Sequence, residues 1–413
     1  MSTRTTPAPG AAPAPEAPPA APAAARPPVR DRYFDLLRAL ALFRVVLYHL
    51  TGWAWLPLVF PSMGVMFALA GNLMARSLKR PAAGVIRGRM RRLLPPLWLL
   101  GVVGVTGMVL QGWGPGDEGH PGWWWLHLAF WIVPFSDPPH AEGLPGVHGL
   151  IGENWAAELA GPLWYIRAYL WYVLLSPLLL KALRALPAVT ILMPLALAVA
   201  FEQSWLTLPG ERVPSALTDF STFGACWILG MAHQEGVLER LPRYVVPSVA
   251  PVIALTGLWY ALHHDFGPGN DLDGMPLAQA LWSFGTVLVL LHVSPSWSQW
   301  PRRLRAFAGT ITLLNSRAVT IYLWHNTCIL VAATLWDRLW GFPVLEENVP
   351  GLLESVWPVL VLVWVLIGCC VLAFGWVEDL AARQRPRLWP AGDARGGTRG
   401  RGRGRRRRPA AAG

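Results

Sequence analysis

Repeated apolar stretches of about 20 residues constrain this chain more than any other feature. A helix of that length crosses the hydrocarbon core of a bilayer, and helices satisfy their own backbone hydrogen bonds there. The composition agrees, because 54% of the 413 residues are hydrophobic and 14% are charged, against about 25% charged in a typical soluble domain. The sequence therefore predicts an all-α fold, a polytopic transmembrane bundle of about ten helices.

The predicted spans lie at residues 33–55, 58–78, 93–111, 162–180, 187–206, 221–235, 244–263, 276–293, 317–336 and 353–376. Alternate connections between them collect most of the Lys and Arg, and the positive-inside rule assigns those connections to the cytoplasm. The pattern predicts a multi-pass protein of the cell membrane with both termini in the cytoplasm.

Two further segments have compositions that do not build a hydrophobic core. Residues 1–30 are rich in Pro and Ala, and they predict a disordered cytoplasmic N-terminus before the membrane domain at 31–380. Residues 381–413 predict a disordered, Arg-rich cytoplasmic tail. We expect the tail to lie on anionic membrane lipid, and we expect no nucleic-acid partner.

The first predicted span carries ionisable side chains within an apolar run, DRYFDLLRALALFRVVLYHLT at residues 31–51. Arg38 and His49 are eleven residues apart, about three helical turns, so they lie on nearly the same helix face. Ionisable groups inside a membrane are costly and usually mark function. The alternative is structural: Arg38 extends to the membrane interface, and His49 is hydrogen-bonded within a packed bundle.

A basic connection, predicted between 78 and 93, holds Lys79, Arg80, Arg87, Arg89, Arg91 and Arg92. Such a cluster is typical of a positive-inside anchor. Arg89 and Arg92 are also three residues apart at the mouth of a helix, and such a pair can bind phosphate oxygens. A phosphorylated cytosolic donor would suit this pair.

Two later spans contain further ionisable groups. Arg167 lies inside the span at 162–180 among aromatic residues that are typical of an interface belt. As an intramembrane charge it can pair with an acidic residue on the outer side. His325 shares a helix face with Tyr322 in the span at 317–336, where a hydrogen-bonded core histidine is the simpler interpretation.

Several classes of chemistry find no support in the sequence. The four cysteines have no metal-ligand spacing, so no metal site is predicted. The sequence contains no Gly-rich phosphate loop, the motif that would indicate a nucleoside triphosphatase. It also contains no Gly-x-Ser-x-Gly motif, which would indicate a serine nucleophile.

The order of the motifs resembles the integral-membrane acyltransferase 3 family over about residues 32–376. The resemblance rests on RYFDLLRALALFRVVLYHL, GVMFALAGNLMARSL, RMRRLLPPLW, LWYIRAYLWYVLLSP and the late YLWH. The family usually has Ser-Gly where this chain has Ala70-Gly71, followed by an aromatic residue where this chain has Asn72.

The resemblance implies transfer of an acyl group from cytosolic acyl-CoA, with acetyl-CoA the default donor, to a hydroxyl reached from the other side of the membrane. Acceptors in the family are sugars of polysaccharides, glycolipids and cell walls, and some secondary metabolites. His49 matches the family's essential first-helix histidine, and Arg38 matches the basic residue before it. Arg89 and Arg92 match an Arg-x-x-Arg motif that is thought to hold coenzyme A.

An imidazole near its working pH can take the proton of an acceptor hydroxyl during attack on a thioester. We therefore expect the CoA phosphates at Arg89 and Arg92, with the pantetheine arm reaching between helices toward His49. Arg38 would meet a donor phosphate or hold a carboxylate in place. Arg167 would stabilise the developing oxyanion. The sequence leaves open whether His49 is a general base or a transient acyl carrier.

Two rival functions remain at the level of sequence. Buried charges within about ten spans also suit a transporter or flippase of a lipid-linked or small anionic substrate. A membrane-bound O-acyltransferase of the lone-histidine kind would instead use the late His325. The acyl chain, the acceptor and the oligomeric state are not specified by the sequence.

Overall fold

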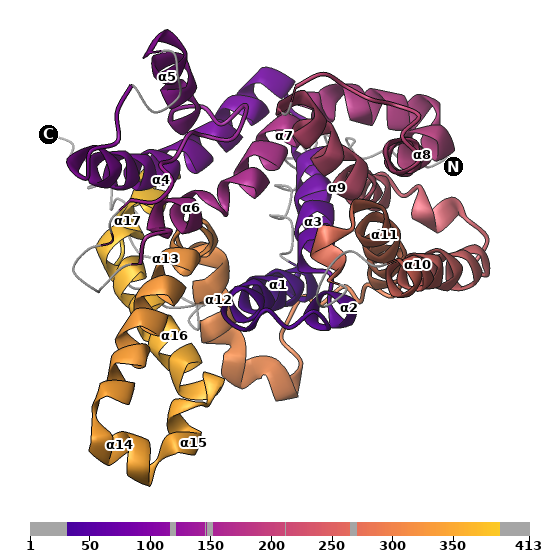
Figure 1. Ribbon diagram of the computed structural model, residues 1–413. Helices are drawn as coiled ribbons and strands as arrows, with labels where there is room; N and C mark the ends of the chain where they lie inside the picture. The colour runs from indigo at the N-terminus through magenta and orange to yellow at the C-terminus, as the bar shows by residue number, and fades with distance from the viewer. Residues whose placement is uncertain are drawn as a thin grey trace, which may run out of the picture.

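The computed structural model describes residues 31–115, 121–144, 146, 152–210, 212–264 and 271–388. Within these ranges the chain forms helices and no strand, packed side by side (Figure 1). The predicted all-α class is confirmed. The predicted N-terminal segment at 1–30 and the tail beyond residue 388 lie outside the described residues.

The long helices of the described part follow the predicted spans. They are α1 (Arg32–Thr51), α3 (Ser62–Ser77), α4 (Ala82–Leu110), α7 (Leu163–Ala185), α8 (Pro187–Glu202), α9 (Arg212–Gln234), α10 (Val245–His263), α11 (Pro276–His292), α13 (Ala318–Asp337) and α16 (Val356–Phe374). Shorter helices are α2 (Leu56–Val59), α5 (Pro121–Leu128), α6 (Trp155–Ala160), α12 (Ala308–Ser316), α14 (Pro343–Asn348), α15 (Pro350–Leu353) and α17 (Trp376–Ala381), with the 3₁₀ turns η1 (Ala129–Trp131), η2 (Leu238–Arg240), η3 (Leu272–Gly274), η4 (Arg302–Phe307) and η5 (Arg338–Gly341).

Six segments of the described chain are long and apolar enough to cross a membrane. These are 56–77, 82–110, 155–185, 245–263, 318–341 and 356–374, and α8 and α11 are shorter apolar helices. The chain is therefore a multi-pass helical bundle, while the predicted count of ten spans is not confirmed.

The predicted start of the third span at residue 93 is wrong, because α4 already begins at Ala82. Arg and Lys end an apolar stretch without ending a helix, since both are good helix formers. The 29 residues of α4 extend roughly 43 Å, beyond a hydrocarbon core of roughly 30 Å. Arg89 and Arg92 thus lie on the first turns of a helix that extends out of the apolar region, and not in a loop.

Glycines allow α3 and α9 to pack at close range. A Cβ added at Gly71 would lie 2.1 Å from the Trp227 carbonyl oxygen, and one at Gly230 would lie 1.8 Å from the Ala68 carbonyl oxygen. Small residues at such positions let helix backbones approach in a membrane, where dispersion replaces the hydrophobic effect as the main attraction.

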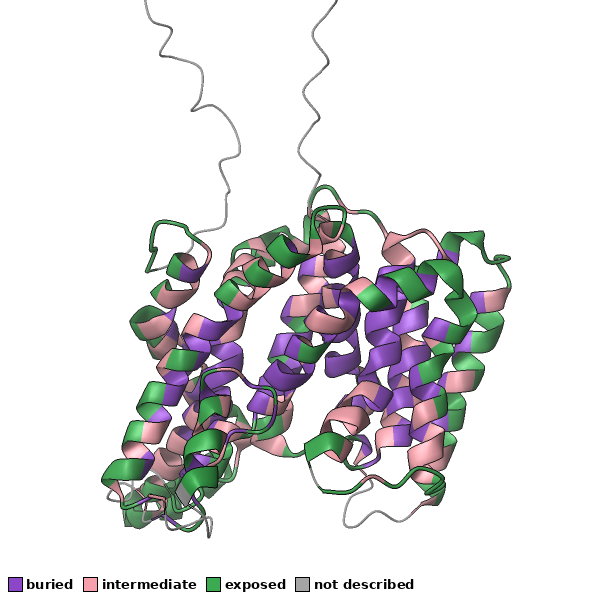
Figure 2. Cartoon of the chain, turned by 90° about the horizontal axis from the view of Figure 1, so that it is seen from above, coloured by how far each residue is buried: buried purple, intermediate pink, exposed green. Residues whose placement is uncertain are grey.

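Apolar side chains on the outer helices face away from the bundle. On α10, for example, the exposed fractions of Val252, Leu255, Trp259 and Leu262 are 62%, 57%, 55% and 62%. Figure 2 shows buried residues concentrated on the inner helices and exposed ones along the outer helices. An outer apolar surface is suited to lipid.

Helix α1 lies between the early and the late helices of the chain. It packs against α3 on one side and against α12, α13 and α16 on the other, as Figure 1 shows near its centre. The ionisable side chains of α1 are therefore placed beside residues from both ends of the sequence.

Candidate functional site

Three predicted arginines line one cavity of about 320 Å³, which we call the arginine cavity. Arg38 comes from α1, and Arg89 and Arg92 come from the first turns of α4. The lining also includes Tyr165 and Tyr322, from α7 and α13. We call this end of the bundle, where α1 and α4 begin and α3 ends, the basic end.

Arg38 is oriented by an amide from α12. Its Nη1 donates to Oδ1 of Asn315 at 3.2 Å. The Asn315 Nδ2 donates to the carbonyl oxygens of Asp35 and Ile311, both at 2.8 Å. Because the amide nitrogen is committed to carbonyls, Oδ1 is the atom left to accept from Arg38.

Arg89 is tied to the end of α3. Its Nη2 donates to the Leu73 carbonyl oxygen and to Ser77 Oγ, both at 3.3 Å. Arg92 lies three residues further along α4, on the same cavity wall, and its side chain is exposed. One guanidinium is thus held in place while the other is accessible to a bound anion.

Two more cavities adjoin the arginine cavity, and Leu73 lines all three. The basic cavity, of about 430 Å³, is lined mainly by arginines and glycines of α4 together with Ser77 and Arg80. The Trp297 cavity, of about 680 Å³, contains Trp297 and also shares Arg38. A long ligand bound at Arg38 can therefore extend into a neighbouring cavity.

His49 lies in the last turn of α1, and its side chain is exposed. Its ring lies edge to face with that of His325 from α13, with the centroids 4.9 Å apart at an interplanar angle of 66°. His325 is fully buried. The structure thus brings together the first-helix histidine and the late histidine.

The protonation pattern of neutral His325 follows from its hydrogen bond. Its Nδ1 lies 2.6 Å from the Tyr322 carbonyl oxygen, which can only accept. The proton is therefore on Nδ1, and Nε2 is left as an acceptor. Among the described residues Nε2 has no hydrogen-bond partner. His325 is thus a hydrogen-bonded core histidine with one free acceptor atom.

An aromatic series connects the arginine cavity with the two histidines. The rings of Tyr165 and Tyr322, both in the cavity wall, have centroids 4.9 Å apart. The rings of Tyr322 and His325 have centroids 5.5 Å apart, one turn along α13. His49 itself is not among the residues that line the cavity, and His325 provides the connection.

Arg167 occupies a different environment. It is 3% exposed, and both Nε and Nη2 donate to Oδ2 of Asp219, at 3.2 and 2.7 Å. Its Nη1 pairs with Asp137. Asp219 lies within α9. The structure therefore does not bring Arg167 to the arginine cavity, and its role at the oxyanion stays a prediction.

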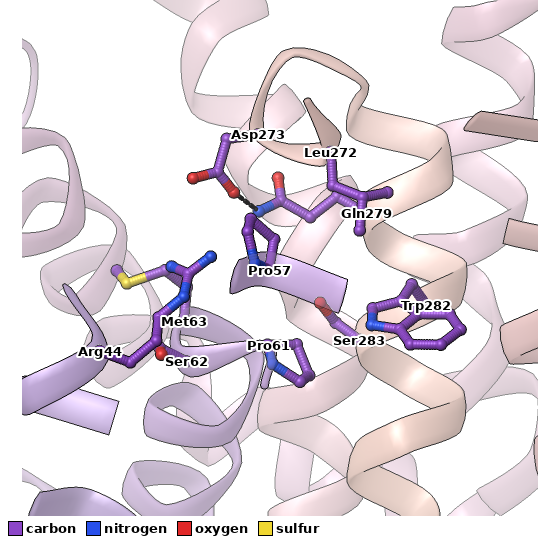
Figure 3. Close-up of a pocket in the computed structure, with 10 residues that line it drawn as sticks. All are labelled: Arg44, Pro57, Pro61, Ser62, Met63, Leu272, Asp273, Gln279, Trp282 and Ser283. Carbon is purple, nitrogen blue, oxygen red and sulfur yellow. Dashed lines mark hydrogen bonds between the residues drawn. The ribbon is translucent and has the colours of Figure 1, made fainter. Parts of the chain in front are cut away.

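Arg44 is a buried cation of α1 that lies outside the arginine cavity. It is 7% exposed, and its guanidinium lies 4.6 Å from the centre of the Tyr48 ring. Figure 3 shows it in a small pocket with Asp273, Gln279 and Ser283. In the described part of the chain its Nε and Nη2 have no hydrogen-bond partner. The pocket, of about 10 Å³, has room for about one water molecule.

No metal site emerges from the described ranges, which contain no group of three His, Cys, Asp or Glu that could hold an ion. The candidate site is thus a set of arginines connected through aromatic residues to two histidines. Such a site can bind a phosphorylated group at one end and accept a proton at the other.

Comparison with known proteins identifies a family. No curated protein and no solved structure matches the sequence. The family model for acyltransferase 3, described as an acyltransferase domain, matches residues 31–374. That match includes α1, the arginine cavity and both histidines, and the chain belongs to the acyltransferase 3 family of membrane proteins.

Proposed function

We propose that this protein transfers an acyl group, acetyl or another short chain, from acyl-CoA to a hydroxyl of a carbohydrate, glycolipid, wall sugar or secondary metabolite. The basic end faces the cytoplasm and receives the donor, and the acceptor reaches His49 from the opposite side of the cell membrane. Both termini are cytoplasmic, and the Arg-rich tail lies on anionic lipid.

One observation carries this proposal: Arg38, Arg89 and Arg92 line a cavity whose wall residue Tyr322 is one helical turn from His325. The arginines suit the CoA phosphates. The narrow pantetheine arm then extends along Tyr322 toward the histidines. The sequence motifs and the packing both support a donor that enters at the basic end and extends toward the two histidines.

In the proposed reaction His49 acts as the general base. It takes the proton of the acceptor hydroxyl as that oxygen attacks the thioester carbonyl carbon. The carbon–sulfur bond breaks, and the thiolate that leaves receives the proton from His49. The unprotonated Nε2 of His325 can accept a hydrogen bond from the His49 ring. That bond would favour one orientation of the His49 ring.

The test uses full-length protein in nanodiscs and measures acetyl-CoA binding. Arg89→Ala/Arg92→Ala should weaken binding by at least about tenfold, while His49→Ala should bind like wild type. Arg80→Ala/Arg87→Ala is the matched control, because it removes two charges from the basic end outside the arginine cavity. Its effect should be much smaller.

Release of free CoA thiol separates acyl transfer from transport. With a membrane extract present to supply acceptor hydroxyls, wild type should release thiol from acetyl-CoA as the acetyl group passes to the acceptor, and His49→Ala should not. If wild type shows neither saturable acetyl-CoA binding nor thiol release, the enzyme proposal is wrong and the transporter or flippase becomes the better hypothesis.

A further inference from the structure

The Trp297 cavity lies at the basic end between the start of α1 and the segment that follows α11. It is about twice the volume of the arginine cavity, 680 against 320 Å³. The two cavities share Arg38 and Leu73. A ligand whose phosphates reach Arg38 from the arginine cavity therefore has a larger adjoining space for its remaining part.

Trp297 is fixed in the wall by the backbone. Its carbonyl oxygen accepts from the Arg32 backbone N–H at 2.9 Å. Its own N–H donates to Oδ1 of Asp31 at 3.3 Å. Its ring also packs edge to face against Tyr33, with centroids 5.5 Å apart. A half-buried aromatic ring held in this way loses little freedom when a planar ligand binds.

Hydrogen-bond donors and acceptors line the cavity around the Trp297 ring. Asn72 and His233 line the cavity and contact each other, with Asn72 Nδ2 and His233 Nδ1 3.0 Å apart. Two carboxylates, of Asp31 and Asp35, also line the cavity, together with the guanidinium groups of Arg38 and Arg76. The cavity thus combines an aromatic surface, hydrogen-bond donors and acceptors, and charges of both signs.

The basic cavity has a different character. Arg80, Arg87 and Arg91 line it together with Arg89 and Arg92, and none of its lining residues is aromatic. It can attract phosphate, but it has no ring on which a base could stack. The two spaces beside the arginine cavity therefore differ in the part of a nucleotide that they suit.

We infer that the Trp297 cavity binds the adenine and ribose of the CoA donor, with the base against Trp297. This inference rests on the proposed function, since it extends the same donor site. The diphosphate then lies at Arg38, Arg89 and Arg92, and the pantetheine arm occupies the arginine cavity. Arg76 is placed for the phosphate on the ribose.

The experiment compares CoA with 4′-phosphopantetheine, which keeps the arm and one phosphate and lacks the adenosine. Binding to full-length protein in nanodiscs is measured for wild type and Trp297→Ala. Loss of one base–aromatic contact should weaken CoA binding by roughly tenfold and leave 4′-phosphopantetheine binding unchanged. Trp297→Phe should recover most of the CoA affinity.

Trp300→Ala is the matched control. Trp300 lies on the same segment, with its ring 5.7 Å from the Arg32 guanidinium, and it does not line the cavity. Its loss should change neither ligand's affinity. Adenosine 3′,5′-bisphosphate should compete with CoA for wild type and compete roughly tenfold less well for Trp297→Ala.

The outcomes separate this inference from the proposed function. If wild type binds CoA through Arg89 and Arg92 but Trp297→Ala leaves the affinity unchanged, only the adenosine site is wrong. Equal weakening of CoA and 4′-phosphopantetheine by Trp297→Ala would also overturn it, as would adenosine-specific weakening by Arg80→Ala/Arg87→Ala instead. No binding of either ligand by wild type would overturn both proposals.

Discussion

The rings of His49 and His325 meet edge to face with their centroids 4.9 Å apart, although they come from opposite ends of the chain. His325 is fully buried and its Nδ1 is held by the Tyr322 carbonyl oxygen, whereas His49 is exposed. One ring can therefore meet a substrate, and the other is placed to orient it. This difference is in line with the proposed roles, in which His49 transfers the proton and His325 positions the His49 ring.

The two histidines should respond differently to substitution. His49→Ala should lower turnover by about 10² to 10⁴-fold, the usual contribution of a general base. His325→Asn keeps a donor for the Tyr322 carbonyl and removes Nε2, so it should lower kcat with little change in the KM for acetyl-CoA. Thiol release at several pH values would measure both effects.

His325→Gln serves as the complementary variant, because its amide can place an oxygen near the position of Nε2. It should recover part of the kcat that His325→Asn loses. Full activity in His49→Ala, with loss only in the His325 variants, would instead indicate an acyltransferase of the lone-histidine kind.

The sequence identified the arginines of the site because their signals are local. Arg38 stands out as a cation within an apolar run, and Arg89 and Arg92 have a spacing that one helix face explains. These three do line one cavity. The predicted start of α4 is wrong because the boundary of an apolar stretch does not mark the boundary of a helix.

The contact between His49 and His325 could not be predicted from local sequence patterns. It depends on how α1 packs against α13, and no local pattern encodes a contact between helices so far apart in sequence. The partners of Arg167 were missed for a related reason. Asp219 lies in the first turns of α9, which begins well before the predicted span at 221–235.

Variants at Arg167 and its partners can separate a structural role of this arginine from a catalytic one. Asp219→Asn should lower the free energy of unfolding by about 3–5 kcal/mol, because it leaves a buried guanidinium without its main counter-charge. Asp137 pairs with the same arginine, but its side chain is 55% exposed. Asp137→Asn should therefore cost less than about 1 kcal/mol. Thermal unfolding in detergent would measure both.

Turnover of an Arg167 variant would address the predicted oxyanion role. We expect Arg167→Met to lose more turnover than its loss of folded protein explains, as that role requires. Activity that follows the folded fraction would instead show that Arg167 is only structural.

The close contact of α3 and α9 should tolerate no added side chain. Gly71→Ala places a Cβ 2.1 Å from the Trp227 carbonyl oxygen, so the helices must move apart. We expect a clear loss of folded yield and of thermal stability. Gly84→Ala is the control, because nothing lies within 4 Å of the added Cβ in α4. It should be neutral or stabilise by about 0.5–1 kcal/mol, and equal behaviour of the two variants would contradict the packing.

A carboxyl group beyond the last span should make stability depend on pH. Glu378 lies in α17, where its Oε1 accepts from the backbone N–H of Thr320 at 2.7 Å. Burial raises the pKa of this carboxyl to about 7, from its ordinary value of 4.5. Between pH 4.5 and 7 the folded protein therefore binds more protons than the unfolded chain.

Stability should consequently fall as the pH rises through this window, by on the order of 1 kcal/mol for a side chain that is only partly buried. Glu378→Gln keeps the acceptor oxygen and removes the titration, so its unfolding temperature should change less between pH 5 and pH 8. Glu346→Gln, at an exposed carboxyl, is the control and should retain the wild-type slope. An unchanged slope in Glu378→Gln would show that another group titrates, and a steeper one would mean that Glu378 is ionised in the folded protein throughout the window.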